Sequence, residues 1–412
     1  LTLLLLPRRR LPIVVAQAHV ARVRLHESAD NAGITALIGS LLEEGTTRRS
    51  EQEISQAIED VGGFLSLSGN GGLVKVLSPD RRLGLDLLLD CLSRPAFQED
   101  AVRRLKEHQL AEIEDRLANP EARARDEFVR IIYGDHPLGR PGLGTTETVE
   151  KIDAAACRQF HAQVFVPNNT VLAVVGDFEP AEMVEMIRQL TRDWPKRELP
   201  RLKLPPLEFA AAQTRIITLP KTSQLNIYLG HLGIRRRDED YYRLLVMDNI
   251  LGVGGAGFTD RLSARLRDRQ GLAYTVAAAI TATAGEEPGM FLAFIGTHPN
   301  QYATVTRILR EEIARIRDEK PTTREVEEAK DYLMATIGFD LTTGDAIASQ
   351  LIQIERFDLG YDYLERFRRA IAAVTPDDVQ AAARKHLKPE RLVQVAAGPV
   401  SDTGAALPRD RP

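Results

Sequence analysis

The most regular hydrophobic pattern in the chain lies at 34–42, where apolar side chains recur with the spacing of one helix face. They stand at positions i, i+3, i+4, i+7 and i+8, which is typical of an amphipathic helix packed on a core. Gly45 follows shortly after, and a glycine past the last turn is a common helix end. The opposite stripe of this predicted helix consists of Ala36, Gly39, Ser40 and Glu43.

Other apolar runs predict strands, with charged helices between them. Residues 1–6 and 13–15 are apolar and flank a basic turn, so we expect two antiparallel strands there. The longest predicted helices are 100–117 and 323–338. Within each half, strands come first, charged helices follow and a last strand closes the pattern. This order favours the α+β class, in which an antiparallel sheet has helices packed on one face.

The two halves resemble each other, which indicates a duplicated domain. In the first shared pattern, a proline precedes an apolar strand that ends at a glycine nine residues later: Pro167 to Gly176, and Pro389 to Gly398. In the second shared pattern, a glycine at a helix end is followed by a strand, at 62–67 and at 271–276.

A linker is predicted near the midpoint of the chain. The segment 193–206 holds four prolines among charged residues and has neither helical nor strand periodicity. We therefore predict an N-terminal domain at 1–194, a linker at 195–208 and a C-terminal domain at 209–412, two homologous domains of ordinary size.

The composition excludes several classes of protein. Of 412 residues, 43% are hydrophobic and 27% charged, as in a soluble globular protein, and the net charge of -4 argues against nucleic-acid binding. No apolar run is long enough to span a bilayer. Cys91 and Cys157 lie in apolar helical patterns, so we expect buried thiols, and two cysteines cannot form a disulfide framework or a cysteine zinc site.

The segment 31–46 resembles the signature helix of the pitrilysin-type metallopeptidases, the family of insulin-degrading enzyme and mitochondrial processing peptidase. The resemblance extends over essentially the whole chain. Further matching motifs lie at 94–97, 133–139, 143–145 and 168–177, and in the glycine-rich stretch from Leu251.

In active members this helix carries an inverted motif, His-x-x-Glu-His, whose histidines bind zinc and whose glutamate activates water. By position these residues correspond to Ala36, Gly39 and Ser40, and a third family ligand corresponds to Glu112. A catalytic zinc normally takes three protein ligands, so one carboxylate is not enough. We expect no catalytic residue and no metal on this chain. The three small residues also suit close helix packing, and His108 with Glu112 suits a solvated pair on a charged helix.

A glycine-rich stretch precedes a second predicted helix, at 258–270. Its glycines include Gly254, Gly255 and Gly257, but no Lys-Ser/Thr follows them, which disfavours a phosphate-binding loop and leaves a flexible turn as the alternative.

The same region resembles the family's substrate element, an arginine followed seven residues later by a tyrosine, here Arg267 and Tyr274. In active members this pair holds substrate carbonyl or carboxylate groups and helps to stabilise the oxyanion, which suits a guanidinium and a phenol. By position alone, Arg267 would be a solvated charge, and Tyr274 a buried aromatic on the strand face of Leu272 and Val276.

A lost zinc motif with a retained Arg–Tyr element resembles the non-catalytic subunit of heterodimeric bacterial members. The resemblance implies a substrate-binding subunit that completes the active site of a homologous catalytic subunit, with zinc on that partner and with unfolded peptides captured by sheet-edge pairing. A homodimer of the isolated chain is a further expectation, as is the bacterial periplasm, because the chain does not begin with Met and an upstream signal peptide would fit. The alternatives are a structural scaffold, like the respiratory-complex core subunits of this fold, or a self-associating peptide-binding holdase.

Overall fold

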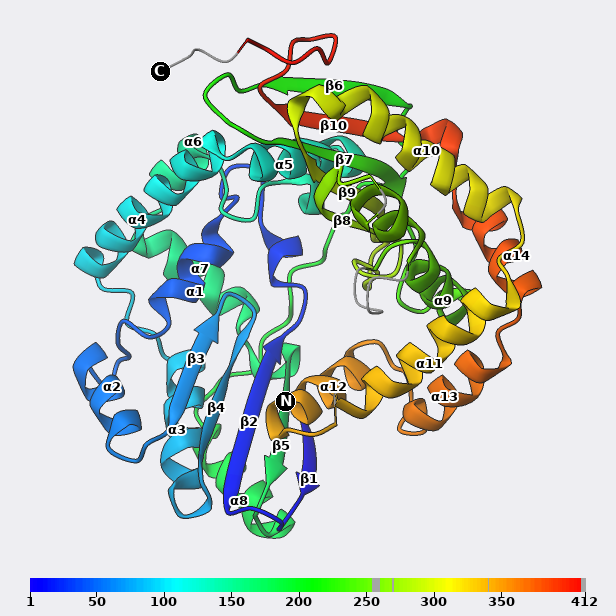
Figure 1. Ribbon diagram of the computed structural model, residues 1–412. Helices are drawn as coiled ribbons and strands as arrows, with labels where there is room; N and C mark the ends of the chain where they lie inside the picture. The colour runs from blue at the N-terminus through cyan, green and yellow to red at the C-terminus, as the bar shows by residue number, and fades with distance from the viewer. Residues whose placement is uncertain (254–259, 269, 340, 409–412) are drawn as a thin grey trace. The chain divides into compact units, whose positions relative to one another are not determined.

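The chain folds into two five-stranded sheets with helices, so the predicted α+β class with two homologous domains is confirmed (Figure 1). The computed structural model describes residues 1–253, 260–268, 270–339 and 341–408. Within these residues, none of the helices combines the length and apolar character that a membrane crossing needs. The chain divides into two compact units: unit 1 comprises Leu1–Ile113, Arg140–Leu204 and Gly338–Gly360, and unit 2 comprises Glu114–Gly139, Pro205–Ile337 and Tyr361–Pro412.

The sheet of unit 1 has the order β1-β5-β2-β4-β3. All neighbouring pairs are antiparallel except β1 and β5, which are parallel, so the sheet is mixed rather than purely antiparallel. The first two strands run in opposite directions, as predicted, but β5 lies between them. The reason is burial: β5 is apolar along its length and suits a central position, whereas both ends of β1 are exposed. The strands are β1 (Thr2–Pro7), β2 (Ile13–Val20), β3 (Phe64–Ser68), β4 (Gly71–Leu77) and β5 (Thr170–Gly176).

Alternate residues of these strands face two different helical layers. On one face, Val14, Ala16 and Ala18 of β2 pack in the main core with helices that are near in sequence. On the other face, Val15 and Val175 pack against α12 (Gly344–Arg356). The helices of the first layer and its surroundings are α1 (Ile34–Leu41), α2 (Glu51–Glu59), α3 (Arg81–Ser93), α4 (Glu99–Ala118), α6 (Thr146–Glu150), α7 (Ala154–Val164) and α8 (Pro180–Leu190).

The sheet of unit 2 repeats this topology in the order β6-β10-β7-β9-β8, again with a parallel edge pair, β6 and β10. Both repeated patterns of the sequence therefore correspond to equivalent strands, β5 with β10 and β3 with β8. The strands are β6 (Gln213–Thr218), β7 (Leu225–Leu232), β8 (Ala273–Ala279), β9 (Met290–Thr297) and β10 (Val393–Gly398). The helices are α5 (Pro120–Tyr133), α9 (Tyr241–Leu251), α10 (Tyr302–Asp318), α11 (Thr323–Phe339), α13 (Tyr363–Ala373), α14 (Pro376–His386) and the π-helical turn η5 (Ser263–Asp268).

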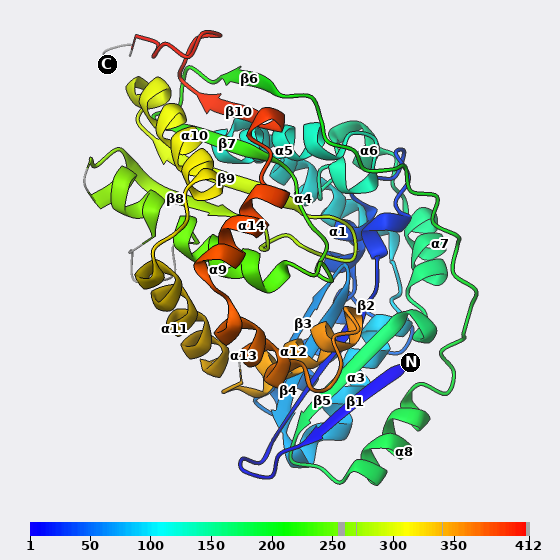
Figure 2. The ribbon, with the colours of Figure 1, turned by 90° about the vertical axis from the view of Figure 1, so that its right-hand side faces the viewer.

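Each sheet is covered by one helix from the other half of the sequence. Helix α12 packs on β2 and β5 of unit 1, whereas α5 packs on β7 and β10 of unit 2 through residues such as Phe128 and Ile132 (Figures 1 and 2). The prediction that helices cover one face of each sheet therefore holds for the helices that are near in sequence to the strands, whereas α12 and α5 cover the other faces. The break at Leu204 and Pro205 falls inside the predicted linker, but contiguous domains at 1–194 and 209–412 do not describe these exchanged helices. Sequence periodicity shows that a helix has an apolar face, not which sheet receives it.

Both cysteine side chains are buried free thiols, as expected, and burial raises the pKa of each to about 12.

Candidate active-site region

Helix α1 is anchored at its beginning by groups from other parts of unit 1. Gly33 precedes it with a φ of 95°, a conformation that favours glycine. The buried carboxylate of Glu27 accepts a hydrogen bond from the backbone N–H of Thr35 at 3.0 Å, and burial raises the pKa of Glu27. From α4, the side-chain amide of Gln109 donates to the carbonyl of Gly33 at 3.1 Å. The helix spans Ile34–Leu41, one residue shorter than predicted, and its apolar face is fully buried.

Gly39 lies in direct backbone contact with the turn between β3 and β4. A Cβ atom added to Gly39 would lie 2.4 Å from the backbone nitrogen of Gly69 and 3.0 Å from the carbonyl carbon of Ser68. A Cβ atom added to Gly69 would in turn lie 2.3 Å from the carbonyl oxygen of Thr35. Real Cβ atoms do not approach backbone this closely, so the position that corresponds to the family's glutamate has no room for any side chain.

The remaining motif positions do not supply metal ligands. Ala36 is half-buried and Ser40 is exposed at the end of α1, and Glu112 is exposed on α4. In the part of the chain that the structure describes, none of these residues belongs to a group of three carboxylate, imidazole or thiol ligands close enough to hold one ion. A methyl group, a hydrogen and a hydroxyl do not form a zinc site, so the residues present do not fit the metal.

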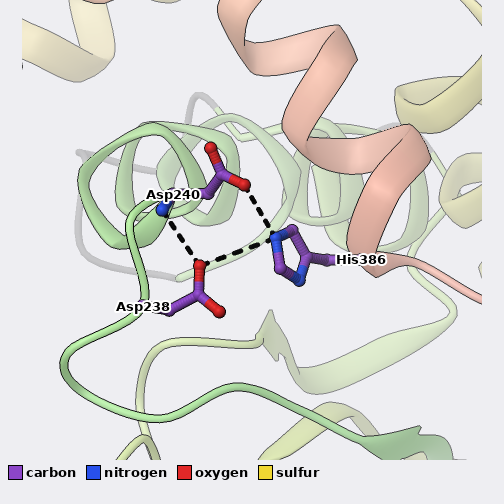
Figure 3. A group of neighbouring side chains, drawn as sticks. All are labelled: Asp238, Asp240 and His386. Atoms are coloured by element: carbon purple, nitrogen blue, oxygen red, sulfur yellow. Dashed lines mark hydrogen bonds and ion pairs between the residues drawn. The ribbon is translucent and has the colours of Figure 1, made fainter.

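One group of potential ligands does lie close together, elsewhere, in unit 2. Asp238 and Asp240 precede α9, and His386 ends α14, with its Nε2 atom 3.0 Å from Asp240 and 3.7 Å from Asp238 (Figure 3). Asp240 is already paired with Lys385 at 2.7 Å and with Arg243 at 2.5 Å. Although burial opposes it, the hydrogen bonds from these basic groups hold the pKa of Asp240 well below its usual range. The group is therefore an ion-pair network that fastens α9 to α14, because a metal cation would have to compete with the charges already there.

The glycine-rich stretch and the Arg–Tyr element are described only in part. Gly254, Gly255 and Gly257 lie outside the described residues. Arg267 lies in η5, a π-helical turn rather than the α-helix predicted, and its Nε donates to Asp268, the next residue, at 3.0 Å. Its side chain is partly exposed, at 31%.

The arginines next to it on this helix have structural partners. Arg261 donates to Glu325 of α11 at 2.7 Å, and Arg265 donates to Glu312 of α10 at 2.7 Å. These two arginines therefore hold the helix in place through ion pairs with α10 and α11.

Tyr274 lies at a bulge at the start of β8. Ala273 pairs with Thr297 and Thr275 pairs with Gly296, so the register shifts at the tyrosine between them. The structure describes its backbone, and its side chain lies outside the description. A bulge interrupts the alternation of side chains along a strand, so the face predicted for Tyr274 from a period of two does not follow at this residue.

The structure also reveals a contact that the sequence pattern did not indicate. The carboxylate of Glu43, just after α1, accepts a hydrogen bond from the backbone N–H of Leu67 in β3 at 2.7 Å. Partial burial raises the pKa of Glu43, although this hydrogen bond acts in the opposite direction. The sequence placed Glu43 on the polar stripe of the helix, but nothing in the pattern indicated that β3 would lie beside it.

Comparison with known proteins identifies the family. Residues 24–146 match the family described as insulinase (peptidase family M16), and residues 151–333 match the peptidase M16 inactive domain. An uncharacterized zinc protease of Streptomyces coelicolor is 30% identical over 389 residues, which cover 92% of this chain and 83% of that protein. The chain belongs to peptidase family M16. The resemblance to pitrilysin-type peptidases is thereby confirmed.

Other M16 proteins extend this picture. An uncharacterized zinc protease of Bacillus subtilis is 26% identical and covers 87% of both chains. Among solved structures, a peptidase M16 inactive domain from Pseudomonas fluorescens superposes with a TM-score of 0.90 at 27% identity, over 98% of this chain and 97% of that one. A chain of complex III from Candida albicans shares the M16 fold with a TM-score of 0.77 at 16% identity, over 97% of this chain and 94% of that one.

Proposed function

We propose that this chain is the non-catalytic, substrate-binding subunit of a heterodimeric zinc metallopeptidase. A homologous M16 subunit with an intact motif would supply the zinc, and this chain would complete the wall that holds the peptide. The observation that carries the proposal is the contact between Gly39 and Gly69. It removes the space for a water-activating glutamate in a chain that otherwise retains the M16 fold.

The Arg–Tyr element supports a role in substrate binding. Arg267 is partly exposed beside Asp268, and a guanidinium offers a forked donor to the carboxylate or carbonyl groups of a peptide. The bulge at Tyr274 is a feature often found beside functional sites. By analogy with active members, both residues would contact the substrate that the partner cleaves.

The exposed edge of the unit 1 sheet supports the capture of extended peptides. β3 is the last strand of that sheet, and an unpaired strand edge can add a peptide as a further strand.

The test is reconstitution with an M16 chain of the same organism that carries His-x-x-Glu-His. We expect cleavage of an internally quenched, unfolded peptide by the mixture and by neither chain alone, with loss of activity on zinc chelation. Arg267→Ala and Tyr274→Phe in this chain should lower the activity of the mixture without preventing assembly. Arg324→Ala removes an exposed arginine from α11 and serves as the matched control.

Two results would contradict the proposal. Chelator-sensitive cleavage by this chain alone would show that it holds a catalytic metal. A mixture that assembles but is no more active than the catalytic chain alone would instead favour a scaffold.

A further inference from the structure

The sheet of unit 1 and the first turn of α12 line a pocket of about 440 Å³. All residues that line it belong to unit 1. Val15 of β2 and Val175 of β5 are cross-strand neighbours on the face that α12 covers, and together with Ile13 they form an apolar floor. Leu11, in the turn between β1 and β2, also lines the pocket and is 61% exposed. The pocket therefore has an apolar floor and an apolar rim beside water.

The charged side chains that line this pocket are mostly basic. They are Arg8, Arg10 and Lys75, with Asp345 as an acid among them. The Nζ atom of Lys75 lies 3.9 Å from Oδ1 of Asp345, so these two charges offset each other. Within the described part of the chain, Arg8 and Arg10 form no ion pair. Two positive charges are thus left at the pocket for an anion from outside.

Backbone hydrogen bonds fix the turn that carries the two arginines. The N–H of Arg8 donates to the carbonyl of Gly176, at the end of β5, at 2.6 Å. The N–H of Asp177 donates to the carbonyl of Ile13 at 3.0 Å. The turn is therefore already in place beside the apolar floor, and a ligand does not have to order it.

A carboxylate on an aliphatic chain satisfies both parts of this pocket. A guanidinium donates two parallel hydrogen bonds to a carboxylate, and an apolar floor removes the chain from water. Each buried methylene group strengthens binding about fourfold. An inorganic anion would leave the floor unused, and a neutral chain would leave the arginines without an acceptor. The volume is at the lower end of the range for small-molecule pockets, roughly 300–1,000 Å³, which suits one short chain.

We propose that this pocket binds an aliphatic monocarboxylate. Arg8 and Arg10 hold the carboxylate, and the chain lies on Ile13, Val15 and Val175. The site is separate from the proposed peptide-binding role, and its test does not depend on a catalytic partner.

The test is a ligand-observed NMR titration of the purified chain with octanoate, its neutral analogue octanamide, and hexanoate. We expect octanoate to bind about tenfold more tightly than octanamide, the ratio that partly exposed charged hydrogen bonds support. Hexanoate has two methylene groups fewer and should bind about fifteenfold more weakly than octanoate.

The decisive variant combines Arg8→Gln with Arg10→Gln. The preference for octanoate over octanamide should fall to nearly one, while octanamide binds as before. Arg9→Gln is the matched control: it removes the arginine between them, which pairs with Glu179 at 2.5 Å, and should leave the preference unchanged. Leu11→Ser changes an exposed apolar side chain and should weaken both ligands by the same factor, about fivefold.

Four results would overturn the proposal. They are no binding of octanoate, equal binding of octanoate and octanamide by the wild type, an undiminished preference in the double variant, and an equal loss of preference in Arg9→Gln. The last of these would mean that the charge of the whole turn attracts the carboxylate. Co-sedimentation of the chain with phosphatidylglycerol vesicles, without octanoate binding, would instead assign the basic turn to a membrane surface.

Discussion

Replacing Gly39 by alanine should destabilise the protein, although the same change usually stabilises a helix. A glycine in a helix interior costs about 1 kcal/mol relative to alanine. Here the new methyl group would lie 2.4 Å from the backbone nitrogen of Gly69 and 3.0 Å from the backbone carbon of Ser68. Overpacking costs about 1–3 kcal/mol, and backbone atoms yield less readily than flexible side chains, so the upper part of that range applies. The expected net loss is about 1–2 kcal/mol, measured by urea unfolding.

The control is Gly338→Ala, a glycine-to-alanine change in α11 where the added Cβ meets nothing within 4 Å. It should leave the stability unchanged or raise it by up to about 1 kcal/mol. If Gly39→Ala is as stable as Gly338→Ala, the turn at Gly69 does not close the motif position and the central argument fails. The same reasoning predicts that the combined variant Ala36→His, Gly39→Glu, Ser40→His will bind no stoichiometric zinc by atomic absorption. A folded variant with one tightly bound zinc would refute it.

Three further predictions concern other parts of the chain. Ile352→Ala, in the exchanged helix α12, should cost about 2–4 kcal/mol because its side chain is buried against strands of unit 1; a loss below about 1 kcal/mol in urea unfolding would argue against this packing. Burial raises the pKa of Asp248 from near 3.8 to about 7, so the native state holds its proton more tightly than the unfolded state does. That contribution to stability is full below the unfolded pKa near 3.8 and is lost as the pH rises to about 7, so the stability of the wild type relative to Asp248→Asn should fall between about pH 4 and pH 7 and then level off. A difference independent of pH would mean that this carboxyl group does not titrate there. Arg265→Ala should lower the melting temperature of the isolated chain, because it removes the partner of the buried carboxylate of Glu312; an unchanged melting temperature would argue against this ion pair as a support of the helix.

The local elements were largely predictable from the sequence. The period of apolar residues at 34–42 predicted α1 to within one residue, and the repeated proline–strand–glycine pattern found β5 and β10 as equivalent strands. These signals depend on neighbouring residues, so a sequence shows them directly. The π-helical turn at 263–268 and the bulge at Tyr274 were missed, because both are departures from a regular period.

The sequence alone determined that the three positions of the family's zinc motif hold no metal ligand of the usual kind, since Ala36, Gly39 and Ser40 carry no imidazole or carboxylate whatever their surroundings. Only the tertiary structure decided that the site is also closed, because the contact between Gly39 and Gly69 joins segments that no local pattern connects. The same holds for the exchange of α5 and α12 between the sheets and for the bond from Leu67 to Glu43. An apolar face or a charged side chain indicates what kind of contact it will make. The fold of the whole chain determines which residues make that contact.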